Sequence, residues 1–393
     1  MENGEGVTPS RLDSLISSHF SILTSPFSIP VPHNGPRGAD VRKSLLWSAL
    51  VACGASACLW VVAVEARAAR QGTGVVQVVP DRAAFTEWLA GFRQDALKNG
   101  ISQATLDLAL ADLEPLPIVI ERDRTQAEHV LALDVYLKRR LNPKTVKTAR
   151  QMAAQNRAVL KRVSSTYGVP PPVVVSVWGL ESTFGRFTGT RPTIAALATL
   201  AHDNRRAAMF RSELLDALRI VEAGDIEPAR MTGSWAGAMG QPQFMPSSYR
   251  KYAVDFDKDG RRDIWQSRPD AFASIANYLK EQGWRRGERW GRAVRVPEAA
   301  EAKIAEAAPL RTEGCSAERA MTMPLTVARW RALGVTTEGR KALPKSKVTA
   351  SLVRAGARSF LVYQNYESLL GYNCAHAYAL SVALLSDRVA GAK

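Results

Sequence analysis

Apolar residues follow one another almost without interruption from Val173 to Leu180, directly after the run Pro170–Pro172. A helix that is apolar nearly all round belongs inside a protein, so this pattern predicts a buried helix rather than an amphipathic one. Proline is tolerated before a helix and in its first turn, and Gly185 is a suitable end. The single acid of this stretch, Glu181, would then lie at the far end of a buried helix.

Helical spacing also dominates the chain before this stretch, where aromatic and leucine side chains recur every three or four residues from Phe85 onward. We predict several helices between residues 69 and 160, interrupted at Asn99-Gly100 and around the prolines that follow. A further helix is expected over Thr145–Tyr167, leading into the apolar stretch.

After the apolar stretch the helical pattern returns, is replaced by a different one, and returns again. Helices are expected over Arg191–Leu200, Arg206–Val221, Ala271–Gln282 and Phe360–Arg388. Residues 285–360 instead contain short runs, scattered proline and glycine, and alternating segments such as Ala293–Val296, which indicate a small β-containing subdomain. The patterns together predict a mainly α fold of the α+β type.

A carboxyl group at the end of a buried helix has its pKa raised by two effects. Loss of water disfavours the charged form, and the negative end of the helix dipole disfavours it as well. A raised pKa suits a general acid that works near neutral pH, so Glu181 is our candidate catalytic residue. The alternative is a glutamate that only reaches water or pairs with a neighbour such as Arg186.

The first 68 residues have the layout of an exported protein. Residues 1–41 are rich in Ser, Pro and Gly and are expected to be disordered, or to precede the true start codon. Residues 42–68 combine a basic pair, an apolar run and the small-residue end Ala66-Arg67-Ala68, as a cleaved signal peptide does. An uncleaved membrane anchor and a lipoprotein signal at Cys53 are the alternatives. Each version exports the rest of the chain across the inner membrane.

The net charge restricts the class of binding partner only slightly. The net charge of +15 suits a polyanion or a membrane surface. The basic residues are dispersed and form no recognisable nucleic-acid-binding motif, so nucleic acid is not expected as a partner.

Cys315 and Cys374 remain after the cysteines of the signal segment are set aside, and exported cysteines often form a disulfide. Two buried free thiols are the alternative. No Cys/His spacing resembles a zinc site.

Closely spaced acids form a second candidate site within residues 255–270. Asp255, Asp257 and Asp259 stand at positions 1, 3 and 5 of a loop that resembles the first part of an EF-hand, with Gly260 at position 6. Three such carboxylates repel one another unless a cation or basic side chains neutralise them. We therefore predict a structural calcium ion. The alternative is a metal-free loop balanced by its own basic residues.

Two longer motifs carry a resemblance to a known family. Gly179–Gly185 is Gly-Leu-Glu-Ser-Thr-Phe-Gly, and Gly233–Tyr252 contains Gly-Ala-Met-Gly-Gln-Pro-Gln-Phe-Met-Pro-Ser-Ser-Tyr. Together they resemble the lytic murein transglycosylase B family, whose members have a lysozyme-like core and cleave the glycan strands of bacterial cell wall. The resemblance runs from about residue 81 to the C-terminus.

The resemblance implies a division of the exported chain into four parts. They are an N-terminal helical domain (69–160), a lysozyme-like catalytic core (161–284) that includes the EF-hand-like loop, a small β-containing subdomain (285–360) and a C-terminal helix (361–393) that completes the core.

The resemblance also implies roles for the residues that match its motifs. Glu181 would be the single catalytic acid/base. The substrate groove would use Tyr136, Arg205, Arg206, Ser234, Gln243, Phe244, Tyr278, Tyr372 and Asn373. The calcium ligands would come from Asp255, Asp257, Asp259, Arg261 and Asp270, the last in place of the usual twelfth-position glutamate. One departure is visible: Gln241-Pro242 stands where a small or aromatic pair with glycine is usual, and is expected to alter the loop beside Gln243.

The implied function is that of a lytic transglycosylase in the periplasm of a Gram-negative bacterium. It would cleave between N-acetylmuramic acid and N-acetylglucosamine and leave 1,6-anhydro ends. No cofactor is expected for catalysis. The expected partners are peptidoglycan glycan strands and other cell-wall enzymes, with membrane contact only through the N-terminal segment. The alternatives are a catalytically silent peptidoglycan-binding protein and a calcium-stabilised scaffold that recruits wall enzymes.

Overall fold

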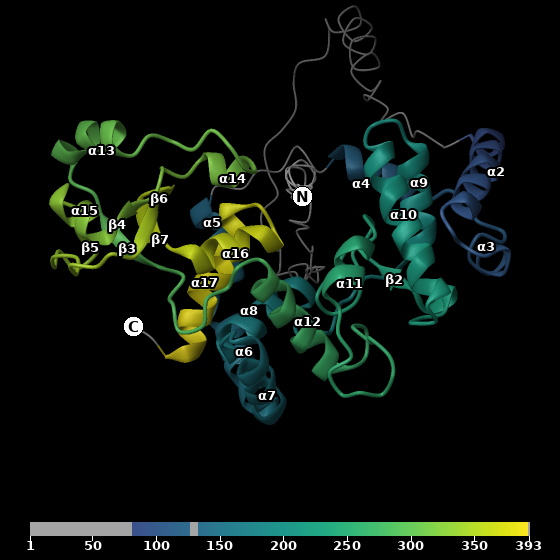
Figure 1. The fold of residues 1–393 in the computed structure, drawn as a ribbon, viewed down its shortest axis with the longest axis horizontal. Coiled ribbons are helices and arrows are strands. Elements are labelled where there is room, and N and C mark those ends of the chain that lie inside the picture. The colour runs from purple at the N-terminus through teal and green to yellow at the C-terminus, as the bar shows by residue number, and fades with distance from the viewer. Residues whose placement is uncertain (1–80, 126–132, 392–393) are drawn as a thin grey trace, which may run out of the picture. The chain divides into compact units, whose positions relative to one another are not determined.

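Helices form most of the chain between residues 81 and 391, as Figure 1 shows. The computed structural model describes residues 81–125 and 133–391, all of which fall in the same unit of the chain. The predicted disordered extension (1–41) and the predicted signal peptide or anchor (42–68) lie outside these residues. Among the described helices, none combines the length and the apolar character needed to cross a membrane.

Except over Thr145–Tyr167, the helices before the apolar stretch follow the predicted pattern. They are α2 (Arg82–Lys98), α3 (Gln103–Ala109), α4 (Pro117–Thr125), α5 (Leu133–Arg140), α6 (Pro143–Gln155) and α7 (Arg157–Tyr167). Side-chain caps explain where two of them begin. Asp81 accepts the N–H groups of Ala83 and Ala84 at the start of α2. Asn142 caps α6, whose first residue is a proline that needs no N–H partner.

The single helix predicted over Thr145–Tyr167 is wrong, because the chain breaks it at Asn156 into α6 and α7. The Asn156 side-chain amide donates to the Met152 carbonyl at 2.8 Å. An asparagine that bonds the nearby backbone in this way competes with helix continuation. The α7 helix then ends at Gly168, which takes the left-handed conformation.

The catalytic-core helices gather around the predicted buried helix. They are α8 (Pro171–Ser182), α9 (Thr193–His202), α10 (Ala207–Glu222), α11 (Pro246–Tyr252), α12 (Arg268–Glu281), α16 (Gln364–Tyr372) and α17 (His376–Ala390). Every residue from Val173 to Trp178 is buried, as expected for a helix that is apolar all round. The C-terminal helix α17, yellow in Figure 1, packs against α8, so the last helices of the chain complete the core.

Residues 291–362 contain a five-stranded antiparallel sheet in the order β4-β6-β7-β3-β5. Its strands are β3 (Gly291–Arg295), β4 (Leu325–Thr326), β5 (Thr336–Thr337), β6 (Thr349–Ala355) and β7 (Arg358–Val362). The helices of this region are η4 (Glu298–Ala300), α13 (Glu301–Ala307), α14 (Ser316–Arg319) and α15 (Val327–Ala332). The helix predicted to begin at Phe360 is wrong at its start, because Phe360 pairs with Val353 and Ala293 in the sheet.

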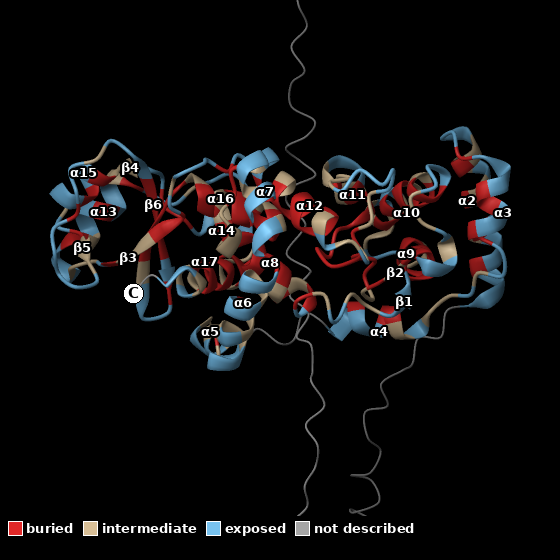
Figure 2. Cartoon of the chain, turned by 90° about the horizontal axis from the view of Figure 1, so that it is seen from below, coloured by how far each residue is buried: buried red, intermediate tan, exposed pale blue. Residues whose placement is uncertain are grey.

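Two hydrophobic clusters lie behind this arrangement. The larger cluster joins the helical core, and the smaller one packs the side chains of the sheet region around the fully buried Trp330. In Figure 2 the buried residues, coloured red, lie along α8, α9, α10 and α12. A short pairing of β1 (Arg191–Pro192) with β2 (Thr232–Gly233), with the turn η3 (Pro228–Arg230) in the intervening chain, closes the core beside α9. The observed fold is thus mainly α with a small antiparallel sheet.

Candidate active site

Glu181 is the penultimate residue of α8. The residue as a whole keeps some exposed surface, while the helix around it is buried on nearly every side. The backbone after it turns sharply, since Thr183 and Phe184 have φ values of 52° and 61° in the left-handed region. Such conformations are costly for residues with a Cβ and cluster at functional sites. The candidate acid therefore lies beside a tightly constrained turn.

Three tyrosines from three different helices come together beside Glu181. They are Tyr278 on α12, Tyr372 on α16 and Tyr378 on α17. Their rings form a row, with centroids 4.6 Å apart between Tyr278 and Tyr372 and 6.1 Å apart between Tyr372 and Tyr378. Burial raises the pKa of all three hydroxyls, and the Glu181 charge adds to the rise. The row therefore consists of neutral hydroxyls at physiological pH.

Two of these hydroxyls have backbone partners. The Tyr278 hydroxyl donates to the Gly371 carbonyl at 2.8 Å, and the Tyr372 hydroxyl donates to the Pro242 carbonyl at 2.7 Å. The Tyr378 hydroxyl makes no hydrogen bond of ordinary geometry within the described residues, although its interaction with Glu181 affects the carboxyl's pKa. Of the three hydroxyls, only that of Tyr378 lowers the pKa of Glu181 among the causes of its shift.

Burial raises the pKa of the Glu181 carboxyl to about 7. The interaction with the Tyr378 hydroxyl and the positive charge of Arg140 both lower it, but burial outweighs them. Within the described residues no second acidic side chain contributes to this shift. The carboxyl can therefore donate a proton near neutral pH and accept one afterwards, which suits a single acid/base.

Arg140 was missed from the sequence, whereas its neighbour Tyr136 was predicted as a groove residue. Both lie on α5, one helical turn apart, and the Arg140 Nε donates to the Tyr136 hydroxyl at 3.3 Å. The guanidinium also lies over the Tyr136 ring, 5.5 Å from its centroid. An arginine four residues after a tyrosine was the available signal, but only the packing of α5 against α17 brings it near Glu181.

In the segment of residues 234–244, the predicted groove residues Ser234 and Gln243 hydrogen-bond the backbone. The Ser234 hydroxyl accepts the N–H groups of Ala236 and Ala238 and so organises the start of the loop. Gln243 has a left-handed φ of 53°, and its side-chain amide donates to the carbonyls of Thr188 and Gly240. This amide therefore joins the loop to the segment that follows Glu181.

Phe244 corrects one prediction. Its ring is 1% exposed and packs against Tyr278 and Tyr372, with centroids 5.4 and 5.9 Å away. A ring buried in this way cannot stack on a sugar from solvent. Phe244 instead supports the tyrosine row from behind, because an apolar ring gains more from burial in the core than from contact with water.

Arg205 and Arg206, at the start of α10, both pair with the buried Asp123 of α4. Arg205 donates to the Asp123 carboxylate at 3.3 Å and to its backbone carbonyl at 2.6 Å. Arg206 also lies over the Phe210 ring, 5.0 Å from its centroid. A buried carboxylate needs such partners. The structure thus gives the arginine pair a structural role, and its contact with saccharide stays a prediction.

Asn373 follows Tyr372 directly and is 3% exposed. Its side-chain oxygen makes no hydrogen bond within the described part of the chain. The next residue, Cys374, forms a disulfide with Cys315 at the start of α14. The disulfide thus joins the end of α16 to the loop before α14, directly beside the predicted groove pair.

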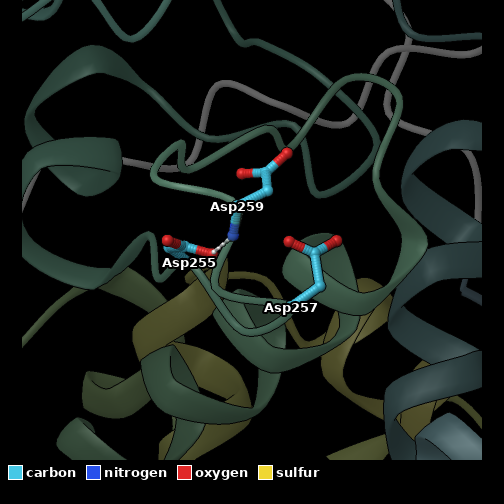
Figure 3. A group of neighbouring side chains, drawn as sticks. All are labelled: Asp255, Asp257 and Asp259. Carbon is cyan, nitrogen blue, oxygen red and sulfur yellow. Dashed lines mark hydrogen bonds between the residues drawn. The ribbon is translucent and has the colours of Figure 1, made fainter.

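The acidic loop brings three carboxylates together, as Figure 3 shows. Oxygens of Asp255, Asp257 and Asp259 lie within 4.8 Å of one another. The Asp255 carboxylate accepts the backbone N–H groups of residues 258, 259 and 260. Gly260 has a φ of 88°, as the sharp turn of such a loop requires. A cluster of hard oxygen donors at this separation fits a calcium ion.

The basic residues of the loop do not neutralise this cluster. Arg262 pairs with Asp225 outside the loop. Between the cluster and any basic residue that the structure describes, there is no ion pair. The metal-free alternative therefore leaves three neighbouring carboxylates without a counter-charge in contact with them.

Asp270 and Arg261 were also predicted as ligands. Asp270 is fully buried, and its two oxygens accept the N–H groups of Phe256 and Asp263 at 2.8 and 2.9 Å. Burial raises its pKa to about 6, with smaller contributions from its neighbours. Asp270 thus anchors the loop to α12, outside the cluster of three carboxylates. The Arg261 N–H donates to Asp259, and its role as a ligand stays a prediction.

Comparisons with known proteins identify the family of the chain. The family model of the transglycosylase SLT domain matches residues 84–387. The membrane-bound lytic murein transglycosylase B of Escherichia coli is 41% identical over 155 residues, which are 39% of this chain and 43% of that protein. The aligned part therefore spans less than half the length of that relative.

Solved structures extend the likeness over most of the chain. SltB3 from Pseudomonas aeruginosa, in complex with NAG-anhNAM-pentapeptide, superposes with a TM-score of 0.72 at 40% identity, covering 78% of this chain and 80% of that one. The E. coli lytic transglycosylase SLT35 in complex with calcium has a TM-score of 0.64 at 29% identity, covering 79% and 93%. By its fold, its site and these matches, the chain belongs to the family of proteins with a transglycosylase SLT domain.

Proposed function

We propose that this protein is a peptidoglycan lytic transglycosylase that cleaves the β-1,4 bond between N-acetylmuramic acid and N-acetylglucosamine. The observation that carries the proposal is the environment of Glu181, a carboxyl with a pKa of about 7 beside a row of neutral tyrosines. Family membership supports the substrate class, as does the NAG-anhNAM-pentapeptide with which SltB3 forms its complex.

In the first step Glu181 protonates the glycosidic oxygen, and the bond from this oxygen to C1 of the muramic acid breaks. The resulting carboxylate then takes the proton of the C6 hydroxyl of the same sugar, whose oxygen closes a 1,6-anhydro ring on C1. Ordinary glycosidases use two carboxyl groups. The proposal of a single acid is supported by the pKa of Glu181, which no second acidic side chain among the described residues affects, and by the neutral tyrosine hydroxyls beside it. Orientation makes the closing step intramolecular.

The neutral groups would orient the sugar. Tyr278 and Tyr372 are held by backbone carbonyls, so their ring edges and oxygens have fixed positions. The unpaired oxygen of Asn373 is suited to receive an N-acetyl or hydroxyl group of muramic acid, because a buried polar group without a partner gains free energy when a ligand supplies one.

The loop at Asp255, Asp257 and Asp259 would hold a calcium ion that stabilises the fold. The separation of the three carboxylates supports this part of the proposal, as does the calcium complex of SLT35. The Arg261 carbonyl stays a predicted further ligand, whereas Asp270 would anchor the loop from outside the cluster. The ion would take no part in the reaction.

The setting would be the periplasm of a Gram-negative bacterium. The signal-like segment at residues 42–68 supports export. The similar protein of E. coli is named a membrane-bound transglycosylase, which supports an envelope location. Glycan strands would be the principal partner, and other cell-wall enzymes are further candidates.

The test is a digest of purified sacculi in water labelled with heavy oxygen, followed by mass spectrometry. The proposal predicts muropeptides that end in 1,6-anhydro-N-acetylmuramic acid, are one water lighter than lysozyme products and contain no label. Labelled reducing ends would instead identify a hydrolase. Binding to sacculi without any cleavage would identify a catalytically silent wall-binding protein.

A further inference from the structure

The turn after the catalytic helix is unusual because three residues in succession have left-handed backbone angles. Thr183, Phe184 and Gly185 have φ values of 52°, 61° and 75°. Glycine adopts this conformation readily, but residues with a Cβ do so at a cost and keep it only when their surroundings hold them there. Since Glu181 lies two residues before this turn, whatever holds the turn also sets the position of the acid.

Part of the support comes from α8 itself. The Ser182 hydroxyl donates to the Trp178 carbonyl at 3.1 Å and accepts the Gly185 N–H at 3.0 Å. The Phe184 ring packs on the Trp178 ring and lies so close to Gly179 that a Cβ there would be 2.4 Å from it. The turn thus folds back on the indole of Trp178.

The remaining support comes from Gln241, in the loop on the other side of that indole. Its side-chain oxygen accepts the Trp178 indole N–H at 2.8 Å. Its side-chain nitrogen donates to the Trp265 carbonyl at 3.1 Å, and its backbone N–H donates to the Ile264 carbonyl at 2.8 Å. A Cβ on Gly185 would lie 2.5 Å from the Gln241 oxygen, so the amide lies directly against the strained turn.

The side chain at this position has to accept and donate at once. A carboxamide does both, whereas a hydrocarbon does neither and a carboxylate only accepts. Gln241 is 4% exposed, so a substitute that fails to accept would leave the indole N–H without a partner in the core. Both residues of the pair Gln241-Pro242 thus hold neighbouring elements: Gln241 hydrogen-bonds the Trp178 indole on the catalytic helix, and the Pro242 carbonyl accepts from Tyr372.

We infer that Gln241 is a positioning residue for Glu181, which it acts on through Trp178 and the turn Thr183–Gly185. It also connects this turn to Ile264 and Trp265, in the segment between the acidic loop and α12. The inference rests on the proposed function, in which Glu181 is the acid, but it concerns a residue with no contact to the reacting atoms.

The test compares two single variants, their double variant and one control. Gln241→Leu and Trp178→Phe each remove one partner of the hydrogen bond, and the double variant removes both. Trp330→Phe is the matched control: this indole is also fully buried and donates to a backbone carbonyl, that of Ala350, at 2.8 Å, but it lies in the sheet region. Kinetics on soluble glycan strands and thermal melting are measured for each protein.

A positioning role predicts that Gln241→Leu lowers kcat by roughly 10- to 100-fold in folded protein, with little change in KM, as expected for misplacement of a catalytic group. Trp330→Phe should lower the melting temperature comparably and leave kcat unchanged. The double variant should recover part of the stability lost in Gln241→Leu, because no buried N–H then lacks a partner.

A second measurement does not depend on activity. Titration of the Glu181 carboxyl by NMR should show a midpoint shifted in Gln241→Leu and unshifted in Trp330→Phe. If kcat and the midpoint are both unchanged in Gln241→Leu while Glu181→Gln is inactive, the inference fails and the proposed function stands. If wild-type protein cleaves no peptidoglycan but the midpoint still shifts, the proposed function fails and the positioning role stands.

Discussion

The protein handles carboxyl groups in two opposite ways. Glu181 stands alone at the end of a buried helix, where burial raises its pKa to about 7. Asp255, Asp257 and Asp259 stand together on a largely exposed loop, where backbone N–H groups and the Ser267 hydroxyl donate to them. In the first environment burial outweighs the stabilisation of the charged form by Tyr378 and Arg140, and in the second hydrogen-bond donors stabilise it.

This difference shows how one residue chemistry serves two purposes. A carboxyl whose burial outweighs its partners keeps its proton near neutral pH and can give it to a substrate. Carboxylates that are gathered on a loop offer several hard oxygen donors to one cation. The side chains alone do not decide between the two; the elements around them do.

Removing the isolated carboxyl should have the largest effect. Glu181→Gln keeps the shape of the side chain but cannot donate or accept the proton, so cleavage of peptidoglycan should fall by roughly 10²- to 10⁴-fold or more. The control is Glu222→Gln, the same change at an exposed residue that accepts from Ser102. If purified Glu181→Gln cleaves sacculi at the wild-type rate, Glu181 is not the catalytic acid.

Removing the disulfide should have the next largest effect. Cys315 and Cys374 are 59 residues apart in sequence, and a cross-link that closes a loop of this size stabilises a protein by about 2–4 kcal/mol. Cys315→Ser/Cys374→Ser should lose this amount in denaturant unfolding. Two free thiols titrated in denatured protein isolated from an oxidising compartment would contradict the cross-link.

The raised pKa also predicts how stability depends on pH. Since the folded-state pKa is about 7 against an ordinary 4.5, the folded protein binds more protons than the unfolded chain between these values. Its stability therefore falls as pH rises through that window. Glu181→Gln should be more stable than wild type above pH 7, by about 1–3 kcal/mol after allowance for partial exposure. The difference should vanish below pH 4.5. The measurement is denaturant unfolding of both proteins across this pH range. A difference in the free energy of unfolding that is the same at all pH values would contradict the prediction.

Calcium should have the smallest effect. An ion that binds only the folded state at ten times its Kd stabilises it by about 1.4 kcal/mol, so the melting temperature should rise with added calcium. Asp255→Asn/Asp259→Asn should abolish the rise without abolishing activity. Calorimetry that detects no heat of binding at millimolar calcium would show that the gathered carboxylates hold no ion.

The sequence was enough to predict those features of the two carboxyl sites that depend on local patterns. The apolar run Val173–Leu180 was enough to predict a buried helix, because burial on all sides leaves a continuous apolar pattern. The spacing of Asp255, Asp257 and Asp259 was enough to predict their proximity, because a short loop keeps near neighbours together. Local patterns of this kind need no knowledge of the rest of the chain.

Other features depend on contacts between distant segments. Tyr378 and Arg140 act on Glu181 only because α17 and α5 pack near the end of α8, and nothing in the sequence around them shows this. Phe244 matched a groove motif, yet its ring is buried behind the tyrosines. The break at Asn156 rests on one side-chain bond to the backbone, which competes with a helical pattern that is otherwise intact.

The central claim is that burial holds the Glu181 carboxyl protonated near neutral pH. Its most direct test is an NMR titration of glutamate carboxyl carbons, with the Glu181 signal assigned by its loss in Glu181→Gln. The account predicts a midpoint at about 7 for this group. A midpoint near the ordinary value of 4.5 would contradict it.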